Sequence, residues 1–173
     1  KGEAWPGQQE INFRFADALT MADNHVIYKN GVKEIALLNG CSITFMAKPF
    51  QDWIGNSCHI HSSLWRDGVP CFASDETMFS RWLAGQIACF KELAIFLAPT
   101  INSYKRFAAG SWAPTTLAWG NDNRTCGFRV VGKGAARRAE TRIPGGDANP
   151  YLAFAAIIAA GLRLVVMAII ASR

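Results

Sequence analysis

Closely spaced cysteine pairs are missing from this 173-residue sequence. Its five cysteines are Cys41, Cys58, Cys71, Cys89 and Cys126, an odd number with wide gaps and no CxxC motif. This pattern argues against a disulfide framework and against a zinc–cysteine site. The first residues also show no signal-peptide pattern. We therefore expect a cytoplasmic protein.

A strong excess of one charge is also missing. The chain has 18 Lys and Arg against 13 Asp and Glu, a net charge of +5. This mild excess suits an anionic substrate at least as well as nucleic acid. Aromatic residues do not alternate with the basic ones, as the stacking surfaces of nucleic-acid-binding proteins require. A nucleic-acid-binding module is therefore the weakest hypothesis, and we expect no nucleic-acid partner.

A long uninterrupted hydrophobic run is missing as well. Residues 151–171 are strongly apolar, but Arg163 divides them into pieces of twelve and eight residues. Each piece is too short to cross a bilayer. We predict a buried helix here, begun by Asp147 or Asn149 as the cap with Pro150 in the first turn, and no membrane partner.

The apolar periodicity predicts an α+β domain with a mixed sheet flanked by helices. Two helices precede the last one: residues 16–38, and a helix that starts near residue 76 and is stopped by Pro99. Residues 101–117 are rich in Ser, Gly and Pro, which predicts a loop. The predicted strands are 10–15, 41–46, 59–65, 125–131 and 137–143.

Two histidines one residue apart stand out in the segment GNSCHIHSSLW. On a strand, His59, His61 and Ser63 share one face. Imidazole suits a divalent metal, and neutral imidazole or hydroxyl groups suit phosphate oxygens. An ordinary polar strand face is the alternative, and this motif alone does not decide between them.

A second strand face carries Arg138, Glu140 and Arg142. A carboxylate between two arginines has a lowered pKa and stays ionised. It can bind a metal while the arginines bind phosphate or carboxylate oxygens. A surface ladder of salt bridges is the alternative. Arg106, Arg124 and Arg129 extend the cationic set.

A third candidate pair is Glu3 and Glu10, which flank a Pro6-Gly7 turn. Such a turn brings two carboxylates together from neighbouring extended segments. Mg²⁺ and Mn²⁺ prefer carboxylate ligands. The alternative is two exposed glutamates with no shared role.

The order of the motifs points further than any one of them. In that order, the sequence resembles the catalytic domain of the glutamine synthetase family over roughly residues 1–162. The resemblance implies the glutamine synthetase/guanido kinase-like fold, with a mostly antiparallel sheet. The motifs are residues 7–12 (GQQEIN), 44–49 (TFMAKP), 58–61 (CHIH), 102–106 (NSYKR), 123–124 (NR), 138–142 (RAETR) and 147–151 (DANPY).

The resemblance implies a reaction in which ATP phosphorylates the γ-carboxylate of glutamate and an amine attacks the acyl phosphate, with two Mg²⁺ or Mn²⁺ ions neutralising charge. The metal ligands it implies are Glu3 and Glu10 at one site, and His59 and Glu140 at the other. The residues it implies for glutamate are Gly55, His59, Arg106 and Arg142. The residues it implies for ATP are His61, Ser63, Arg129 and Arg138. The catalytic residues it implies are Arg124, Arg138 and Glu3.

The sequence departs from the family at the flap after Arg106. The family has a glutamate there that helps bind and deprotonate ammonium, whereas this chain has Trp112. An indole cannot accept a proton, but it can pack against an alkyl chain or a cation. This feature, with Gly-Asn-Ser-Cys before His59, resembles the γ-glutamylpolyamine and γ-glutamylamine ligases. Trp112 is therefore the predicted amine-pocket residue, and the predicted acceptor is a polyamine or another primary amine.

Two alternatives stay open: an ordinary glutamine synthetase that uses ammonia, and a catalytically silent structural homologue. We expect residues 1–173 to form a fragment of one catalytic domain, inactive alone, because the family's first two metal carboxylates and its N-terminal domain have no counterpart here. The family resemblance also implies a homo-oligomer of the dodecameric double-ring type. The end of the chain, residues 163–173, does not follow the family pattern.

Overall fold

The structure is a computed structural model that describes residues 1–171. Its main feature is a four-stranded sheet in the order β1-β6-β5-β4. Strand β6 pairs antiparallel with both of its neighbours, and β4 pairs parallel with β5. The predicted mostly antiparallel sheet is thus confirmed. The strands are β1 (Ile60–Ser62), β4 (Thr116–Asn121), β5 (Cys126–Val131) and β6 (Arg138–Thr141), and a small hairpin joins β2 (Trp65–Arg66) to β3 (Val69–Pro70).

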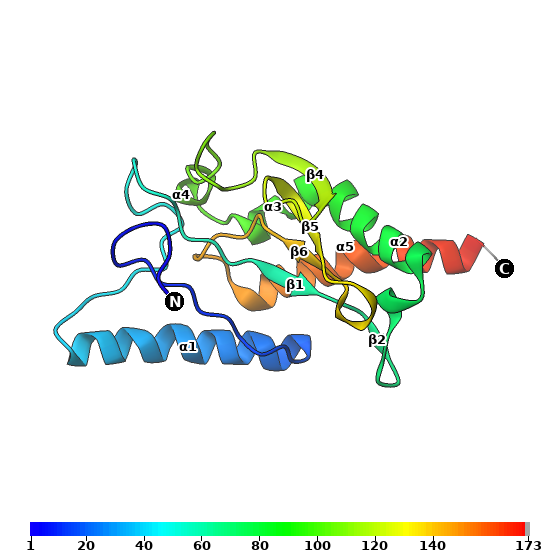
Figure 1. Ribbon diagram of the computed structural model, residues 1–173, viewed down its shortest axis with the longest axis horizontal. Coiled ribbons are helices and arrows are strands. Elements are labelled where there is room, and N and C mark those ends of the chain that lie inside the picture. Colours follow the sequence, from blue (N-terminus) through cyan, green and yellow to red (C-terminus); the bar gives the residue numbers. More distant parts are fainter. Residues whose placement is uncertain (172–173) are drawn as a thin grey trace.

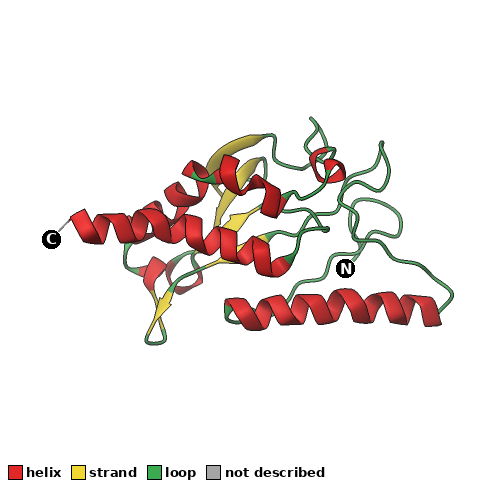
Figure 2. Cartoon of the chain, turned by 180° about the vertical axis from the view of Figure 1, so that it is seen from behind, coloured by secondary structure: helices red, strands yellow, loops and turns green. Residues whose placement is uncertain are grey.

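One face of this sheet is covered by helices, as the two opposite views show (Figures 1 and 2). These are α2 (Glu76–Ala88), α3 (Phe90–Leu97) and α5 (Pro150–Ala171). Their apolar side chains form a core with Phe128 and Val130 of β5 and Ala139 of β6. The buried hydroxyl of Thr141 donates to Gln86 Oε1 over 2.7 Å, which ties β6 to α2. The other face of the sheet is therefore left for polar groups.

Helix α5 confirms the helix that the apolar run predicts. Asn149 caps it: its Oδ1 accepts from the N–H of Tyr151 over 3.0 Å. By length and composition alone its residues 150–167 could cross a membrane, with a mean hydropathy of 1.9, and 39% of this window is buried within the chain. Core helices have the same properties, and Ala153, Ile157 and Ala160 belong to the core. Residues 163–171 of the atypical end continue this helix, whereas residues 172–173 lie outside the described residues.

Helix α1 (Ala18–Leu38) confirms the first predicted helix and lies along one side of the molecule (Figure 1). Asp17 caps it by accepting from the N–H of Thr20 over 3.0 Å. The Tyr151 hydroxyl, at the start of α5, donates to Asp23 over 2.5 Å. Lys29 Nζ donates to the carbonyl of Gly146 over 2.8 Å. These bonds hold α1 against the loop before α5.

Two predicted strands are wrong. Residues 10–15 and 41–46 contain no strand. One aromatic residue of each segment packs on helix α1 instead: Phe13 lies against Tyr28 with ring centroids 5.3 Å apart, and Phe45 lies against the same Tyr28 at 5.8 Å. Lys29 Nζ also lies 5.1 Å from the Phe45 ring centroid. The aromatic residues Phe13 and Phe45 thus pack against a helix rather than within a sheet.

Three further boundaries differ from the sequence predictions. The second predicted helix breaks at Cys89 into α2 and α3. The predicted loop 101–117 contains the short helix α4 (Ile101–Tyr104), which starts with a capping box between Thr100 and Ser103. The last two residues of this predicted loop belong to β4. The strand predicted over residues 59–65 shortens to β1 because only Ile60–Ser62 pairs with β6.

Helices α2 and α5 approach each other closely through glycine. A Cβ on Gly85 would lie 2.2 Å from the backbone oxygen of Ala160. We therefore expect Gly85→Ala to push the helices apart and to cost about 1–3 kcal/mol of unfolding free energy. Gly31→Ala in α1 is the control, because nothing lies within 4 Å of its added Cβ. This control should gain about 0.5–1 kcal/mol from helix propensity. Urea unfolding measures both, and a Gly85 variant as stable as the parent protein would contradict the close approach.

Candidate active site

The uncovered face of the sheet carries a row of three charged or titratable side chains. His61 of β1 lies directly opposite Glu140 of β6, and Glu140 lies directly opposite Arg129 of β5. Residues directly opposite each other point to the same side of a sheet. Arg138 and Arg142, two residues either way along the chain, share that side. The shared face predicted for Arg138, Glu140 and Arg142 is therefore confirmed, whereas Ser63 lies outside β1.

Glu140 is the centre of this group and is only 2% exposed. Its Oε2 accepts from Arg129 Nη1 over 3.0 Å, and its Oε1 accepts from Arg142 Nη1 over 2.6 Å. Burial opposes ionisation, but the charges of His59 and Arg142 and the bond from Arg129 lower the pKa of Glu140. The surface-ladder alternative is wrong, because Glu140 and Arg142 are both buried.

His59 completes the Glu140 group from just before β1. Its Nδ1 lies 3.3 Å from Glu140 Oε1. Burial, followed by the charge of Arg142, lowers the pKa of His59 to about 3. The imidazole is therefore neutral near pH 7, which is the form that a metal ligand needs. At this pH the two arginines, rather than His59, keep Glu140 ionised.

His61 and Ser63 are held in different ways. His61 Nδ1 accepts from Arg138 Nε over 3.1 Å. A neutral imidazole with an accepting Nδ1 carries its proton on Nε2. His61 thus presents an N–H donor, which suits a phosphate oxygen. The hydroxyl of Ser63 accepts from Trp65 Nε1 over 2.9 Å.

Arg106 reaches the same region from the end of α4. It is 2% exposed, and its Nη2 donates to the carbonyls of Arg142, over 3.4 Å, and Ile143. Burial lowers the pKa of Arg106 to about 10, so it remains charged at neutral pH. Gly55 packs on it: a Cβ there would lie 2.7 Å from Arg106 Cγ. Among the described residues, the Nε atoms of Arg106 and Arg142 have no acceptor, which fits an anionic ligand.

Glu3 and Glu10 converge as the turn between them predicts. The N–H of Glu3 donates to the Gln8 carbonyl over 3.0 Å, which closes the turn. Lys1 Nζ lies 3.3 Å from Glu3 Oε1 and 2.6 Å from Glu10 Oε2. Hydrogen bonds with Glu3 and with Lys1 lower the pKa of Glu10 to about 2. Glu10 is thus ionised at neutral pH.

The predicted metal ligands form two separate pairs, Glu3 with Glu10 and His59 with Glu140. Within residues 1–171, no point gathers three His, Cys, Asp or Glu side chains. Ionised carboxylates and a neutral imidazole are chemically suitable for Mg²⁺ or Mn²⁺. Each pair therefore fits as part of a metal site, with the remaining ligands supplied by water, phosphate or groups outside this chain.

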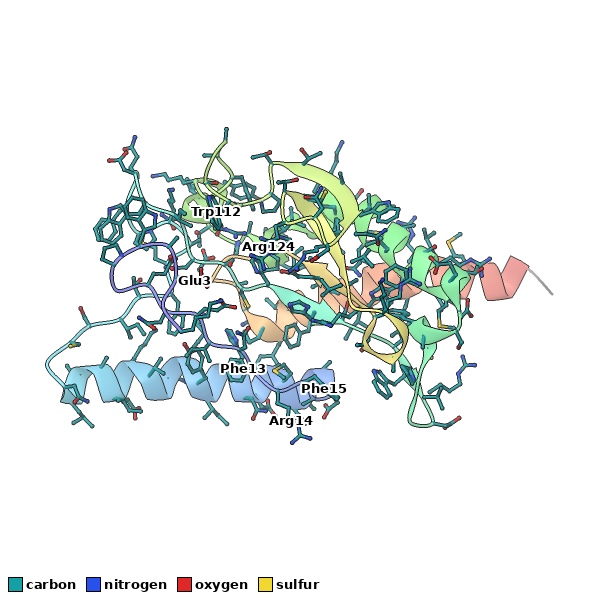
Figure 3. All side chains as sticks on the ribbon, viewed as in Figure 1. Glu3, Phe13, Arg14, Phe15, Trp112 and Arg124 are labelled. Carbon is teal, nitrogen blue, oxygen red and sulfur yellow. The ribbon has the colours of Figure 1, made fainter. Side chains whose placement is uncertain are left out.

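Arg124 and Trp112 are labelled in Figure 3, and no hydrogen bond or ion pair within the described residues joins either side chain to the Glu140 group. Arg124 is exposed in the turn between β4 and β5. Trp112 is 70% exposed in the loop before β4, and its φ of 62° is unusual for a residue other than glycine. The structure thus brings His59, His61, Arg129, Arg138 and Arg142 to Glu140 or to one another, and it keeps Glu3 and Glu10 as a separate pair. The roles of all these residues stay predictions.

The sequence predictions missed two carboxylates. Asp122 accepts from Arg129 Nε over 2.9 Å and so orients that arginine. Asp147, one of two candidate caps for the last helix, instead accepts from the hydroxyls of Ser103, over 2.6 Å, and Thr100, over 3.0 Å. Asp122 follows the missed strand β4, so no sequence signal placed it beside Arg129.

Comparison with known proteins identifies the family. The family described as "Glutamine synthetase, catalytic domain" matches residues 1–169. The chain belongs to the glutamine synthetase family. It is 54% identical over 167 residues to the γ-glutamylethanolamide synthetase GlnA4 of Streptomyces coelicolor. This match covers 94% of the chain and 36% of that protein. It is 47% identical over 169 residues to a glutamate–isopropylamine ligase of a Pseudomonas species. This second match covers 92% of the chain and 37% of that ligase.

A solved GmaS/ADP complex shares this glutamine synthetase-type fold. Its TM-score is 0.83 at 40% sequence identity, over 90% of this chain and 38% of that one. The fold and the resemblance to the γ-glutamylamine branch are therefore confirmed. The chain spans little more than a third of the length of these relatives.

Proposed function

We propose that this chain is part of an ATP-dependent ligase that joins the γ-carboxylate of glutamate to a primary amine. The Glu140 group carries the proposal: one buried carboxylate bound by Arg129 and Arg142 and close to a neutral His59. Such a group supplies metal-binding atoms beside fixed cations, as phosphoryl transfer requires. The family membership and the two amine-ligase relatives support the same reaction class.

In this reaction a γ-carboxylate oxygen of glutamate attacks the γ-phosphorus of ATP, and ADP leaves. The nitrogen of the amine then attacks the carbonyl carbon of the γ-glutamyl phosphate, inorganic phosphate leaves, and the amine loses a proton. We assign Arg129 and Arg138 to the phosphate oxygens, a role supported by their positive charge and by His61, which offers its Nε2–H beside Arg138. Arg106 and Arg142 carry the buried positive charge that suits the carboxylates of glutamate. Fixed cations stabilise the charge that develops on the transferred phosphoryl group.

Two Mg²⁺ or Mn²⁺ ions are part of the proposal. Glu3 with Glu10 would hold one ion, and His59 with Glu140 would hold the other. Their chemistry is to neutralise the charge on the phosphates. The role of Arg129 and Arg142 is then to keep Glu140 ionised and fixed in position. We also propose a homo-oligomer of the double-ring type and a cytoplasmic location.

The experiment that tests this function uses the full-length protein with ATP, Mg²⁺ and glutamate. Phosphate release is measured with ammonium, ethanolamine, isopropylamine, putrescine and spermine in turn. We expect turnover with a primary amine to exceed turnover with ammonium. Ammonium as the best substrate would instead identify an ordinary glutamine synthetase, a class that includes a 42% identical relative from Methanocaldococcus jannaschii. Turnover with no amine would identify a silent homologue.

The exposed indole of Trp112 supplies a further prediction. A carboxylate at this position could pair with NH₄⁺, which an indole cannot do. We expect Trp112→Glu to raise kcat/KM for ammonium by about tenfold, the effect of one hydrogen bond to a charged group. Trp119→Glu is the control, because Trp119 is also exposed, at 53%, but lies in β4. Equal ammonium kinetics in both variants would place Trp112 outside the amine pocket.

A further inference from the structure

We infer that Trp5, Trp53 and Phe50 form an aromatic wall that selects amines carrying an apolar substituent. This inference rests on the proposed ligase function and adds specificity-determining residues to it. The three side chains come from two segments, the turn between Glu3 and Glu10 and the loop before Gly55. In Figure 1 these two loops lie together at the end of the molecule that is farthest from the C-terminus.

The aromatic wall is a defined contact rather than a loose group of exposed rings. The rings of Trp5 and Trp53 stack with centroids 5.5 Å apart and an interplanar angle of 4°. The Phe50 ring lies on Trp53 with centroids 4.4 Å apart. Phe50 is nevertheless 55% exposed and Trp53 36% exposed. The wall therefore combines rings in fixed contact with an accessible surface. The aromatic residues of the core have no such accessible surface.

Polar contacts fix the aromatic wall beside the candidate active site. The Trp5 carbonyl accepts from the N–H of Gln8 over 3.0 Å within the Glu3–Glu10 turn. Gln8 Nε2 in turn donates to the Gly55 carbonyl over 3.2 Å. Gly55 packs directly on Arg106. The turn that carries Trp5 is thus joined through Gln8 to Gly55, which lies two residues after Trp53 and packs on a residue proposed for glutamate.

The chemistry of this position fits an alkylammonium ion. Such an ion is positively charged at its nitrogen and apolar along its substituent. Indole and phenyl faces attract cations and also bury apolar groups, and the neighbouring Glu3 and Glu10 are acidic. Ammonium has no substituent to bury, so it gains less from the wall. The wall should therefore change the choice between amines rather than the use of glutamate or ATP.

The test is carried out on the full-length protein with ammonium, methylamine, isopropylamine and n-butylamine as acceptors. The quantity compared is the ratio of kcat/KM for isopropylamine to kcat/KM for ammonium. We expect this ratio to fall about fivefold to tenfold in Phe50→Ala and in Trp53→Leu, which corresponds to losing the burial of one or two carbon atoms of the substituent. Trp53→Phe keeps a ring at that position and should restore most of the ratio. The KM values for glutamate and ATP should stay within about twofold of the parent protein, since the wall is proposed to contact the amine and neither of these substrates.

Trp119→Leu is the matched control, because Trp119 pairs with Phe128 and so lies on the opposite side of the sheet from Arg129. The inference is overturned if the ratio stays unchanged in both wall variants, or if Trp119→Leu lowers it equally. A changed oligomer size on gel filtration with an unchanged ratio would show an interface between copies instead. Absence of turnover with any amine in the parent protein would overturn the proposed function as well, so the two failures are distinct.

Discussion

Replacing Glu140 with glutamine is expected to remove about 3–5 kcal/mol of unfolding free energy, as the loss of one partner from a buried ion pair does. The substitution keeps the size of the side chain and removes its charge. Arg129 and Arg142 would then face each other's charge across a neutral amide in a site that is 2% exposed. Solvent cannot screen this charge as it does at the surface.

The control for this prediction is Glu76→Gln. Glu76 also accepts two hydrogen bonds from one arginine, Arg137, but its side chain is 69% exposed. Water screens this pair, so its removal should cost far less. Urea unfolding followed by tryptophan fluorescence compares the two variants at the same pH. Equal losses would show that the burial of Glu140 does not decide its contribution.

Glu140→Gln should also abolish phosphate release under the proposed function. An uncharged amide is a weaker ligand for a hard cation than a carboxylate. The variant should be assayed well below its unfolding midpoint, with its fold checked by circular dichroism. Full activity in a folded variant would remove Glu140 from the proposed metal site.

The sequence predicts the polar faces of this site because strand alternation is a local property. Arg138, Glu140 and Arg142 share a face wherever their strand lies. The contact of His61 with Arg138 is different, because it depends on the register between β1 and β6, which are far apart in the chain. Register is set by the packing of the whole sheet. The contact between His61 and Arg138 therefore could not be predicted from the alternation of side chains along either strand.

The wrong strand predictions have a related cause. Residues 41–46 have the composition of a strand, but they pair with no strand, and Phe45 packs on Tyr28 and Lys29 of α1. Composition reports that a segment has apolar side chains to pack and does not report which element they pack on. Strand β4 shows the reverse case, because it is a strand without the composition of one. It is an edge strand with four of its six residues drawn from Thr, Gly, Ala and Asn, so the composition does not predict it.

Gly55→Ala is the second substitution with a large expected effect. The added Cβ would lie 2.4 Å from the Ala47 backbone oxygen and 2.7 Å from Arg106 Cγ. We expect a loss of about 1–3 kcal/mol of unfolding free energy. Because Arg106 is displaced, KM for glutamate should rise at least tenfold, while KM for ATP changes little. Gly2→Ala is the control, since nothing lies within 4 Å of its Cβ and it needs no positive φ.

The two contacts of Gly55 can be separated by a double-mutant cycle. Arg106→Ala removes the clash with the arginine side chain but leaves the clash with the Ala47 carbonyl. Gly55→Ala should therefore cost less in the Arg106→Ala protein than in the parent protein, but it should still cost something. Residues in contact give such non-additive effects. Full additivity would show that Gly55 is required by the backbone of residue 47 alone, and that it does not set the position of Arg106.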